Sequence, residues 1–76
     1  MIYEIVEHIG VITKHPNGWT KELNIAIWNG EEPKFDIRDW CRDFDGVHMS
    51  RGIKLDRDEA YALYKMLGEY FENSEA

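Results

Sequence analysis

Apolar and polar residues alternate over short runs along the first three quarters of the chain, and this pattern is typical of half-buried β-strands. The runs cover residues 2–13, 21–29, 34–41 and 47–55. Turn signals separate the runs, and the Asn-Gly pairs in two of them supply the positive φ angles that tight hairpins need. They stand at HPNG (15–18), NGEEP (29–33) and DFDG (43–46). Four strands joined by such short turns predict an antiparallel meander.

The two faces of the predicted strands differ in their chemistry. The alternation in the first run is imperfect, and Gly10 predicts a bulge or a bend there. In KFDIRDW (34–40), Phe35 and Ile37 share one face, whereas the other face is polar and aromatic. That second face carries Lys34, Asp36, Arg38 and Trp40, and on the preceding strand Glu22, Asn24, Ala26 and Trp28.

The last quarter of the chain changes to a helical period. Asp56 followed by Glu59 forms the sequence pattern of a capping box, which marks the start of a helix. Apolar residues then recur every three or four positions, at Ala60, Leu63, Tyr64, Leu67, Tyr70 and Phe71. The pattern predicts one helix over about residues 56–71 and a short tail at 72–76. We therefore expect residues 1–76 to form a single α+β domain, a four-stranded antiparallel meander followed by one C-terminal helix.

One helix covers one face of such a sheet, and the sequence holds no second layer for the other face. Antiparallel sheets tolerate one solvated face. We expect the face with Trp28 and Trp40 to be this open face, with both indoles exposed. The apolar stripe of the helix is broader than one thin sheet needs, so part of it is expected to meet another subunit.

The composition limits the class of protein. A chain of 76 residues builds a thin core, and small scaffolds often gain stability by association. Cys41 is the only cysteine, which excludes an internal disulfide and fits a reducing cytoplasm. No apolar run is long enough to span a bilayer, and the opening residues IYEIVEH lack the basic leader of a signal peptide. We expect a cytoplasmic protein without a membrane partner.

The formal net charge of −6 at pH 7 taken alone argues against nucleic acid, whose phosphates attract basic surfaces. The distribution of charge weakens this argument, because residues 1–20 and 21–55 each carry −1 whereas residues 56–76 carry −4. Most of the acidic excess therefore belongs to the predicted helix and tail.

Catalysis is not expected from this sequence. The three histidines are scattered, and Cys41 has no histidine at a recognisable spacing, so we interpret it as a small apolar residue. A magnesium site built from aspartates is disfavoured, because Asp36 and Asp39 point to opposite faces of a strand and the next two belong to a turn. We predict no catalytic residues, no metal site and no cofactor.

The predicted open face has the chemistry of a surface that binds single strands. Such surfaces stack bases on aromatic rings, at about 1–3 kcal/mol per base, and place cations along the backbone. Trp28 and Trp40 supply rings, and Lys34 and Arg38 share the side of Trp40. Packing explains the same residues, because a tryptophan on a strand usually packs and Arg38 can pair with Asp36 or Glu22 across the sheet. The pattern leaves both interpretations open.

The run KELNIAIWNGEEPKFDIRDW (21–40), followed by SRGIKL (50–55) and a capped helix, resembles a known domain. It is similar to the single-stranded DNA-binding domain of the transcriptional positive coactivator family, whose eukaryotic members include positive cofactor four. The resemblance covers about residues 18–71 and is densest over 33–55. The positions that look like the short bacterial branch are Gly18, Trp19, Lys21, Glu22, Leu23, Asn24, Trp28, Asn29, Pro33, Lys34, Asp36, Ile37, Arg38 and Trp40.

The resemblance implies a curved four-stranded sheet, one helix and a homodimer whose helices pack at the interface. Two sheets then form channels that hold unpaired DNA with little sequence preference. On this chain it implies Trp28 as the stacking aromatic, Arg38 as the strand arginine and Trp40 as the aromatic beyond it. It also implies Arg51 as the basic residue before the Gly-Ile pair.

The chain departs from the eukaryotic members at two places. Their turn between the second and third strands carries lysines, whereas this chain has Glu31 and Glu32 there. Their serine-rich acidic arm is absent, so regulation through that arm is not carried over. Stacking needs no large positive field, so the expectation of strand binding is retained.

We predict a non-enzymatic homodimer that binds single-stranded DNA or RNA with little sequence preference, in a transcription, replication or repair setting; stacking treats DNA and RNA alike. The expected contact residues are Trp19, Lys21, Asn24, Trp28, Lys34, Arg38, Trp40 and Arg51. The expected dimer interface consists of Leu63, Tyr64, Leu67, Tyr70 and Phe71. The alternative is a protein-interaction module of a transcription complex, in which the tryptophans anchor a protein partner.

Overall fold

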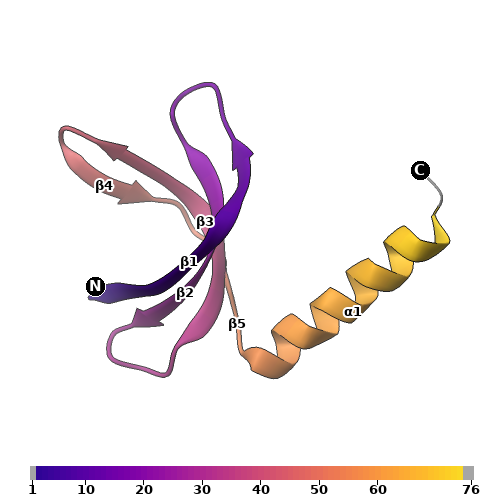
Figure 1. Cartoon of the computed structure of the whole chain (residues 1–76). Coiled ribbons are helices and arrows are strands. Elements are labelled where there is room, and N and C mark those ends of the chain that lie inside the picture. The colour runs from indigo at the N-terminus through magenta and orange to yellow at the C-terminus, as the bar shows by residue number, and fades with distance from the viewer. Residues whose placement is uncertain (1, 75–76) are drawn as a thin grey trace.

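The computed structural model describes residues 2–74, which form a sheet and a helix (Figure 1). The elements in chain order are β1 (Tyr3–Lys14), β2 (Thr20–Trp28), β3 (Lys34–Asp43), β4 (Gly46–Met49), β5 (Ile53–Leu55) and α1 (Arg57–Asn73). The strands pair in the order β1-β2-β3-β4, with β5 also paired to β3, and every pairing is antiparallel. The predicted antiparallel meander followed by one helix is confirmed.

The predicted fourth strand, residues 47–55, is divided into two short strands. β4 pairs with the second half of β3 and β5 pairs with its first half. Gly52 lies in the break, where the chain approaches β3 so closely that a Cβ would overlap the carbonyl oxygen of Ile37 and the Cβ of Arg38. Glycine permits such an approach because it has no side chain, and Gly52 is the position at which the break passes close to β3.

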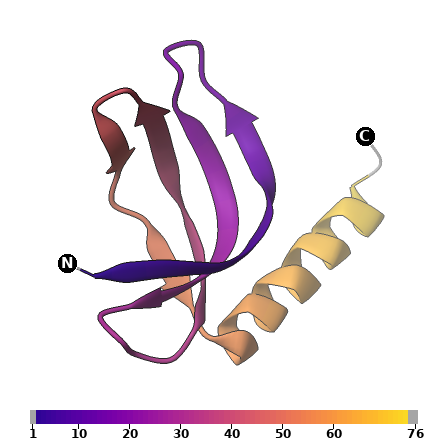
Figure 2. The same cartoon turned by 60° about the vertical axis from the view of Figure 1, so that its left-hand side comes forward.

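β1 is long and irregular, and Figure 2 shows it turning sharply midway along its length. Its register against β2 shifts between Ile5 and Glu7, between His8 and Gly10, and between Val11 and Thr13. Bulges of this kind bend a strand and increase its twist. The bulge or bend expected at Gly10 is confirmed by the second of these shifts.

The sheet curls so strongly that positions far apart along its strands meet. Trp40 pairs with Thr20, at the opposite end of β2 from Trp28. The eight residue steps from Thr20 to Trp28 would span about 26 Å on a flat strand. Yet the Tyr3 ring centroid lies 5.5 Å from that of Trp28 and 5.6 Å from that of Trp40. Tyr3 therefore closes the concave side of the sheet between the two indoles.

The hydrophobic core lies on this concave side. Its buried members are Ala26, Trp28 and Trp40, and the residues packed against them are Tyr3, Ile5 and Met49. The opposite face of β2 and β3, which includes Leu23 and Phe35, is only half-buried. The expectation that the helix-side face is buried and the tryptophan face is open is wrong. The physical reason is curvature, which folds the sheet and β1 over the face that the helix leaves free.

α1 begins as predicted and then projects away from the sheet (Figures 1 and 2). The Asp56 side chain accepts from the Glu59 backbone N–H at 2.8 Å, and the Glu59 side chain accepts from the Asp56 N–H at 2.8 Å. This is the expected capping box. α1 contacts only β3 and β5, and none of its residues is buried. A single chain therefore leaves the apolar stripe of the helix largely uncovered.

Candidate nucleic-acid interface

Strand alternation sends one set of side chains from β2 and β3 to the concave side of the sheet. We call this surface the indole face, and it consists of Glu22, Asn24, Ala26, Trp28, Lys34, Asp36, Arg38 and Trp40. The face brings together most of the contact residues that the sequence predicted. Their accessibility, however, differs from the prediction.

Both indoles on this face are buried. Trp28 exposes 2% of its surface and Trp40 exposes 1%. Their Nε1 groups have no hydrogen-bond partner among residues 2–74. The expectation that both rings stand open for stacking is wrong for this structure, because the start of β1, rather than the helix, closes over them.

Trp28 is enclosed by a second ring and by cations of the chain itself. The Tyr3 ring is tilted by 32° against the indole. The guanidinium carbon of Arg38 lies 4.1 Å from the Trp28 ring centroid, and Lys54 Nζ lies 5.1 Å from it. Such cation–π contacts are worth about 0.5–1 kcal/mol when exposed and about 2 kcal/mol or more when desolvated. A nucleobase would have to displace these groups to stack on Trp28.

Arg38 is held inside the sheet by a buried ion pair with Asp36. Its Nε and Nη2 donate to the two Asp36 carboxylate oxygens at 2.7 and 2.6 Å, and the side chains are 7% and 0% exposed. Its Nη1 also donates to the carbonyl oxygen of Ser50 at 3.4 Å. In this structure Arg38 is therefore engaged within the chain, which confirms the pairing with Asp36, and its contact with a phosphate stays a prediction. This bidentate geometry positions the guanidinium against Trp28.

Glu22 anchors a second network on the indole face. Arg42 donates to its two oxygens at 2.7 and 3.1 Å, and the Thr20 hydroxyl donates at 2.6 Å. These hydrogen bonds, that of Arg42 above all, lower the pKa of Glu22 from 4.5 to about 2, although burial opposes the shift. Asn24 Nδ2 donates to Glu22 at 3.5 Å, and Asn24 Oδ1 lies 2.7 Å from His8 Nδ1. Asn24 is buried and hydrogen-bonded within the chain in this way, and its contact with a base or the nucleic-acid backbone stays a prediction.

Lys21 and Trp19 lie away from the indole face. Lys21 is on the opposite face of β2, where its Nζ donates to Asp39 Oδ1 at 3.1 Å. This hydrogen bond, with a second contact from His15, lowers the pKa of Asp39. Trp19 precedes β2, is half-buried and lines a shallow hollow beside His15 and Asp39. The structure does not bring these two predicted contact residues to the face that holds Trp28.

Accessible cations line the edge of the indole face, and we call Lys34, Arg51 and Lys54 the cationic rim. Lys34 is half-buried at the start of β3, and Arg51 is exposed in the break between β4 and β5. Lys54 is exposed on β5, directly across from Asp36. Only the first two were among the predicted contact residues. Lys54 was not among them, because its own strand, β5, is separated from β4 only by the break at Gly52.

Comparison with known proteins shows the family of this chain. The family model described as Transcriptional Coactivator p15 (PC4) matches residues 15–66, from the β1–β2 turn into α1. The chain belongs to the PC4 family. An uncharacterized protein of Treponema pallidum (strain Nichols) is 38% identical over 65 residues, which cover 86% of this chain and 74% of that protein.

Membership of the PC4 family indicates nucleic-acid binding or a coactivator-like function, and the family is not one of enzymes. The matched segment contains the whole indole face and the cationic rim. Within residues 2–74 no helix combines the length and apolarity needed to cross a membrane. The same residues include no group of three or more metal-ligating side chains placed to hold an ion.

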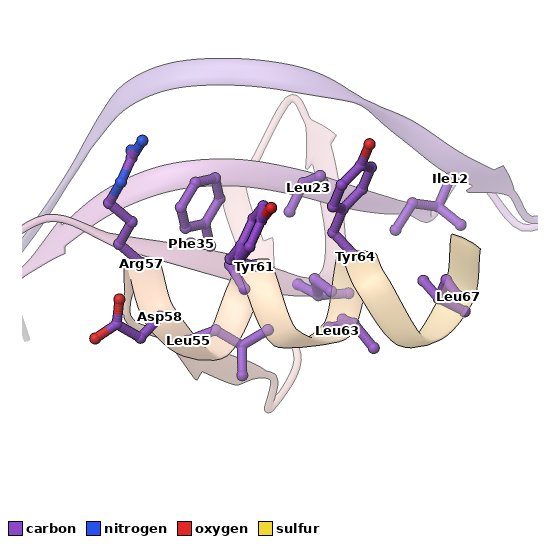
Figure 3. Close-up of a pocket in the computed structure, with 12 residues that line it drawn as sticks. Ile12, Leu23, Phe35, Leu55, Arg57, Asp58, Tyr61, Leu63, Tyr64 and Leu67 are labelled. Atoms are coloured by element: carbon purple, nitrogen blue, oxygen red, sulfur yellow. The ribbon is translucent and has the colours of Figure 1, made fainter. Parts of the chain in front are cut away.

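An apolar groove lies on the other side of the PC4-family sheet, between α1 and the half-buried face of β2 and β3 (Figure 3). Its volume is about 740 Å³. Its lining comprises Ile12, Leu23, Phe35, Ile37, Leu55, Arg57, Asp58, Ala60, Tyr61, Leu63, Tyr64 and Leu67. Of the predicted dimer residues, Leu63 is half-buried, whereas Tyr64, Leu67, Tyr70 and Phe71 expose between 48% and 67% of their surface.

Two residues that shape the indole face were not anticipated from the sequence. Tyr3 contacts both indoles, and Arg42 anchors Glu22. The only sequence signal for Tyr3 is an aromatic residue at the start of a strand, and Arg42 merely precedes a turn. Both contacts join residues at least 20 positions apart, and local patterns do not reveal such contacts.

Proposed function

We propose that this protein binds single-stranded nucleic acid with little sequence preference, as a cytoplasmic homodimer without enzymatic activity. The observation that supports this most is the match to the PC4 family over residues 15–66. That segment includes the curved indole face together with its cationic rim. A transcription or repair setting is proposed on the same ground.

The cationic rim is the proposed contact surface for phosphates. Lys34, Arg51 and Lys54 keep accessible charge, whereas Arg38 and Lys21 are engaged by Asp36 and Asp39. Each phosphate neutralised on a single strand contributes about −0.7 to the slope of log affinity against log salt. With so few cations available, a shallow salt dependence follows.

The proposed stacking surface is the accessible part of the aromatic cluster. Tyr3 is half-buried and touches both Trp28 and Trp40, so the indoles support it from below. Trp19, also half-buried, is a separate proposed stacking ring outside the indole face. Arg38 contributes indirectly in this proposal, by holding Trp28 in place.

The proposed homodimer uses α1 and the groove beneath it. Tyr61, Tyr64, Tyr70 and Phe71 are each at least 60% exposed on one helix, which is unusual for aromatic side chains of a monomer. A second copy presents the same stripe, and a self-complementary contact buries both.

A fluorescence titration with labelled oligo-dT tests nucleic-acid binding. We expect saturable binding, weakened about tenfold in the double variant Lys34→Glu, Lys54→Glu, because two phosphate contacts are reversed in sign. The matched control is Lys14→Glu, an exposed cation at the end of β1 outside the rim. If Lys14→Glu weakens oligo-dT binding equally, the loss of affinity is an effect of net charge alone. Absence of binding at low salt would refute the proposal. Parallel titrations with RNA and duplex DNA at two salt concentrations identify the preferred ligand.

The second candidate function is a protein-interaction module of a transcription complex. The net charge of −6 favours it, because it reduces the affinity expected for nucleic acid. Since both indoles are buried, the partner would contact other residues than these two tryptophans. Retention of a transcription protein in a pull-down, together with no change in tryptophan fluorescence on addition of oligo-dT, would support this second function.

A further inference from the structure

The hairpin between β3 and β4 carries a fully exposed aromatic ring at its tip. Phe44 exposes 97% of its surface, more than any other large hydrophobic residue in residues 2–74. Val47, at the start of β4, exposes a further 48%. An exposed phenylalanine gains nothing from the fold of its own chain, because the ring stays in water.

The turn that carries Phe44 is well defined. Asp43 pairs with Gly46 across the hairpin, and the Asp45 N–H donates to Asp43 Oδ1 at 2.9 Å. Gly46 has a φ of 123°, which glycine adopts without strain. The ring is therefore presented by a hydrogen-bonded turn, and little backbone entropy remains to be lost on binding.

The surroundings of Phe44 are acidic. Asp43 and Asp45 flank the ring in the sequence, and the nearest arginine, Arg42, is engaged by Glu22 at 2.7 Å. His48 Nε2 lies 3.4 Å from Asp43 Oδ1, and within residues 2–74 no ion pair involves Asp45. Phosphate-rich ligands are disfavoured at such a tip by like-charge repulsion, whereas a basic protein surface is favoured.

The position of the tip keeps it free of the other proposed contacts. Figures 1 and 2 both show the β3–β4 hairpin pointing away from α1. β4 pairs only with β3, and the hairpin takes no part in the groove. A dimer formed through α1 would leave this tip accessible.

We propose that the β3–β4 tip is a docking element for a protein partner. The partner has an apolar pocket that accepts the single ring of Phe44, with Lys or Arg side chains at the rim of the pocket facing Asp43 and Asp45. A single aromatic anchor surrounded by polar contacts is a frequent source of most of the binding energy at an interface. This proposal does not depend on nucleic-acid binding by the indole face.

A random peptide library displayed on phage tests the proposal, with the full chain as bait. We expect enriched peptides that combine aliphatic or aromatic residues with Lys or Arg. Synthetic copies should bind Phe44→Ser about 30-fold more weakly than the unchanged chain, the loss typical of an anchor residue. The matched control is Ile2→Ser, a 77% exposed apolar residue outside the hairpin, which should bind as the unchanged chain does. Asp43→Asn with Asp45→Asn should flatten the salt dependence of binding.

Several outcomes would overturn the proposal. Enriched peptides that lack basic residues, or that bind Phe44→Ser unchanged, would show that the tip is not an anchor for a basic partner. Weaker oligo-dT binding by Phe44→Ser would assign the ring to nucleic acid instead. A shift from dimer to monomer in sedimentation of Phe44→Ser would assign it to a second copy. Phe44 makes no buried contact, so folding of the variant is expected and is checked by its circular dichroism.

Discussion

Charged side chains in the interior of this small sheet are held in pairs. Asp36 and Arg38 form a bidentate pair against Trp28, and Glu22 holds Arg42 at the edge of the same face. Removing one member of a buried pair costs about 3–5 kcal/mol, because the remaining charge stays desolvated. At the scale of residues, the charged side chains of the indole face therefore mainly stabilise the sheet itself.

The lowered pKa of Glu22 makes the stability of the fold dependent on pH. The contribution of Glu22 is complete above about pH 4.5 and is lost as the pH falls towards 2, where the folded carboxyl takes up its proton. Over this window we expect the free energy of unfolding to fall by about 1–3 kcal/mol through this group, because Arg42 is half exposed and water screens the pair.

Urea unfolding at several pH values between 6 and 2.5 measures this effect. Glu22→Gln removes the titrating group and should flatten the dependence of unfolding free energy on pH. Glu31→Gln, at an exposed position in the β2–β3 turn, is the control and should keep the slope of the unchanged chain. An unchanged slope in Glu22→Gln would refute the assignment.

At the scale of elements, the break between β4 and β5 decides how the last part of the sheet is built. It lets β3 pair with two short strands along one edge and places Arg51 in an exposed position. Gly52 makes the break possible, because the chain there crosses close to the backbone of Ile37 and the side chain of Arg38. The closest neighbour is backbone, which cannot rotate away.

Gly52→Ala is therefore expected to destabilise the protein by about 1–3 kcal/mol, the usual cost of inserting a carbon into a packed site. Thermal unfolding followed by circular dichroism measures the loss. Gly10→Ala is the matched control, since a Cβ at Gly10 meets no atom within 4 Å, and its effect should stay within about 0.5 kcal/mol. Equal stability of the two variants would show that the approach at Gly52 is not tight.

At the scale of the whole molecule, the two faces of the sheet are covered to different extents. The concave side of the sheet is sealed by β1, whereas the helix touches only β3 and β5 and leaves a groove of about 740 Å³. Small chains often complete such a core through a second copy. The proposed homodimer follows from this imbalance.

Sedimentation velocity at micromolar concentration tests the dimer. We expect the unchanged chain to sediment as a dimer and Leu67→Glu to sediment as a monomer, because a carboxylate would be buried in the groove. Ala62→Glu carries the same change in charge on an exposed helix position outside the groove and should stay dimeric. If the unchanged chain sediments as a monomer, the proposed dimer is refuted, whereas the description of the fold is unaffected.

Much of the architecture was predictable because it depends on local signals. Asn-Gly turns, strand alternation and the Asp56–Glu59 capping box act over a few residues, and the structure shows each of them in place. The division of the fourth strand was not predictable, since nothing local to Gly52 announces the close approach of β3. For the candidate site, the sequence predicted which residues share a face, but it did not predict how accessible that face is.

Local sequence patterns were enough to predict the order of the elements, the two chemically different sides of β2 and β3, and the resemblance to a family. Which of these sides is closed depends on long-range packing. Alternation separates the two sides of a strand, but it contains no information on which way a sheet curls. Curling is set by bulges in β1 and by contacts such as Tyr3 with Trp28 and Trp40, which join distant parts of the chain. For that reason tryptophans expected at the surface lie in the core.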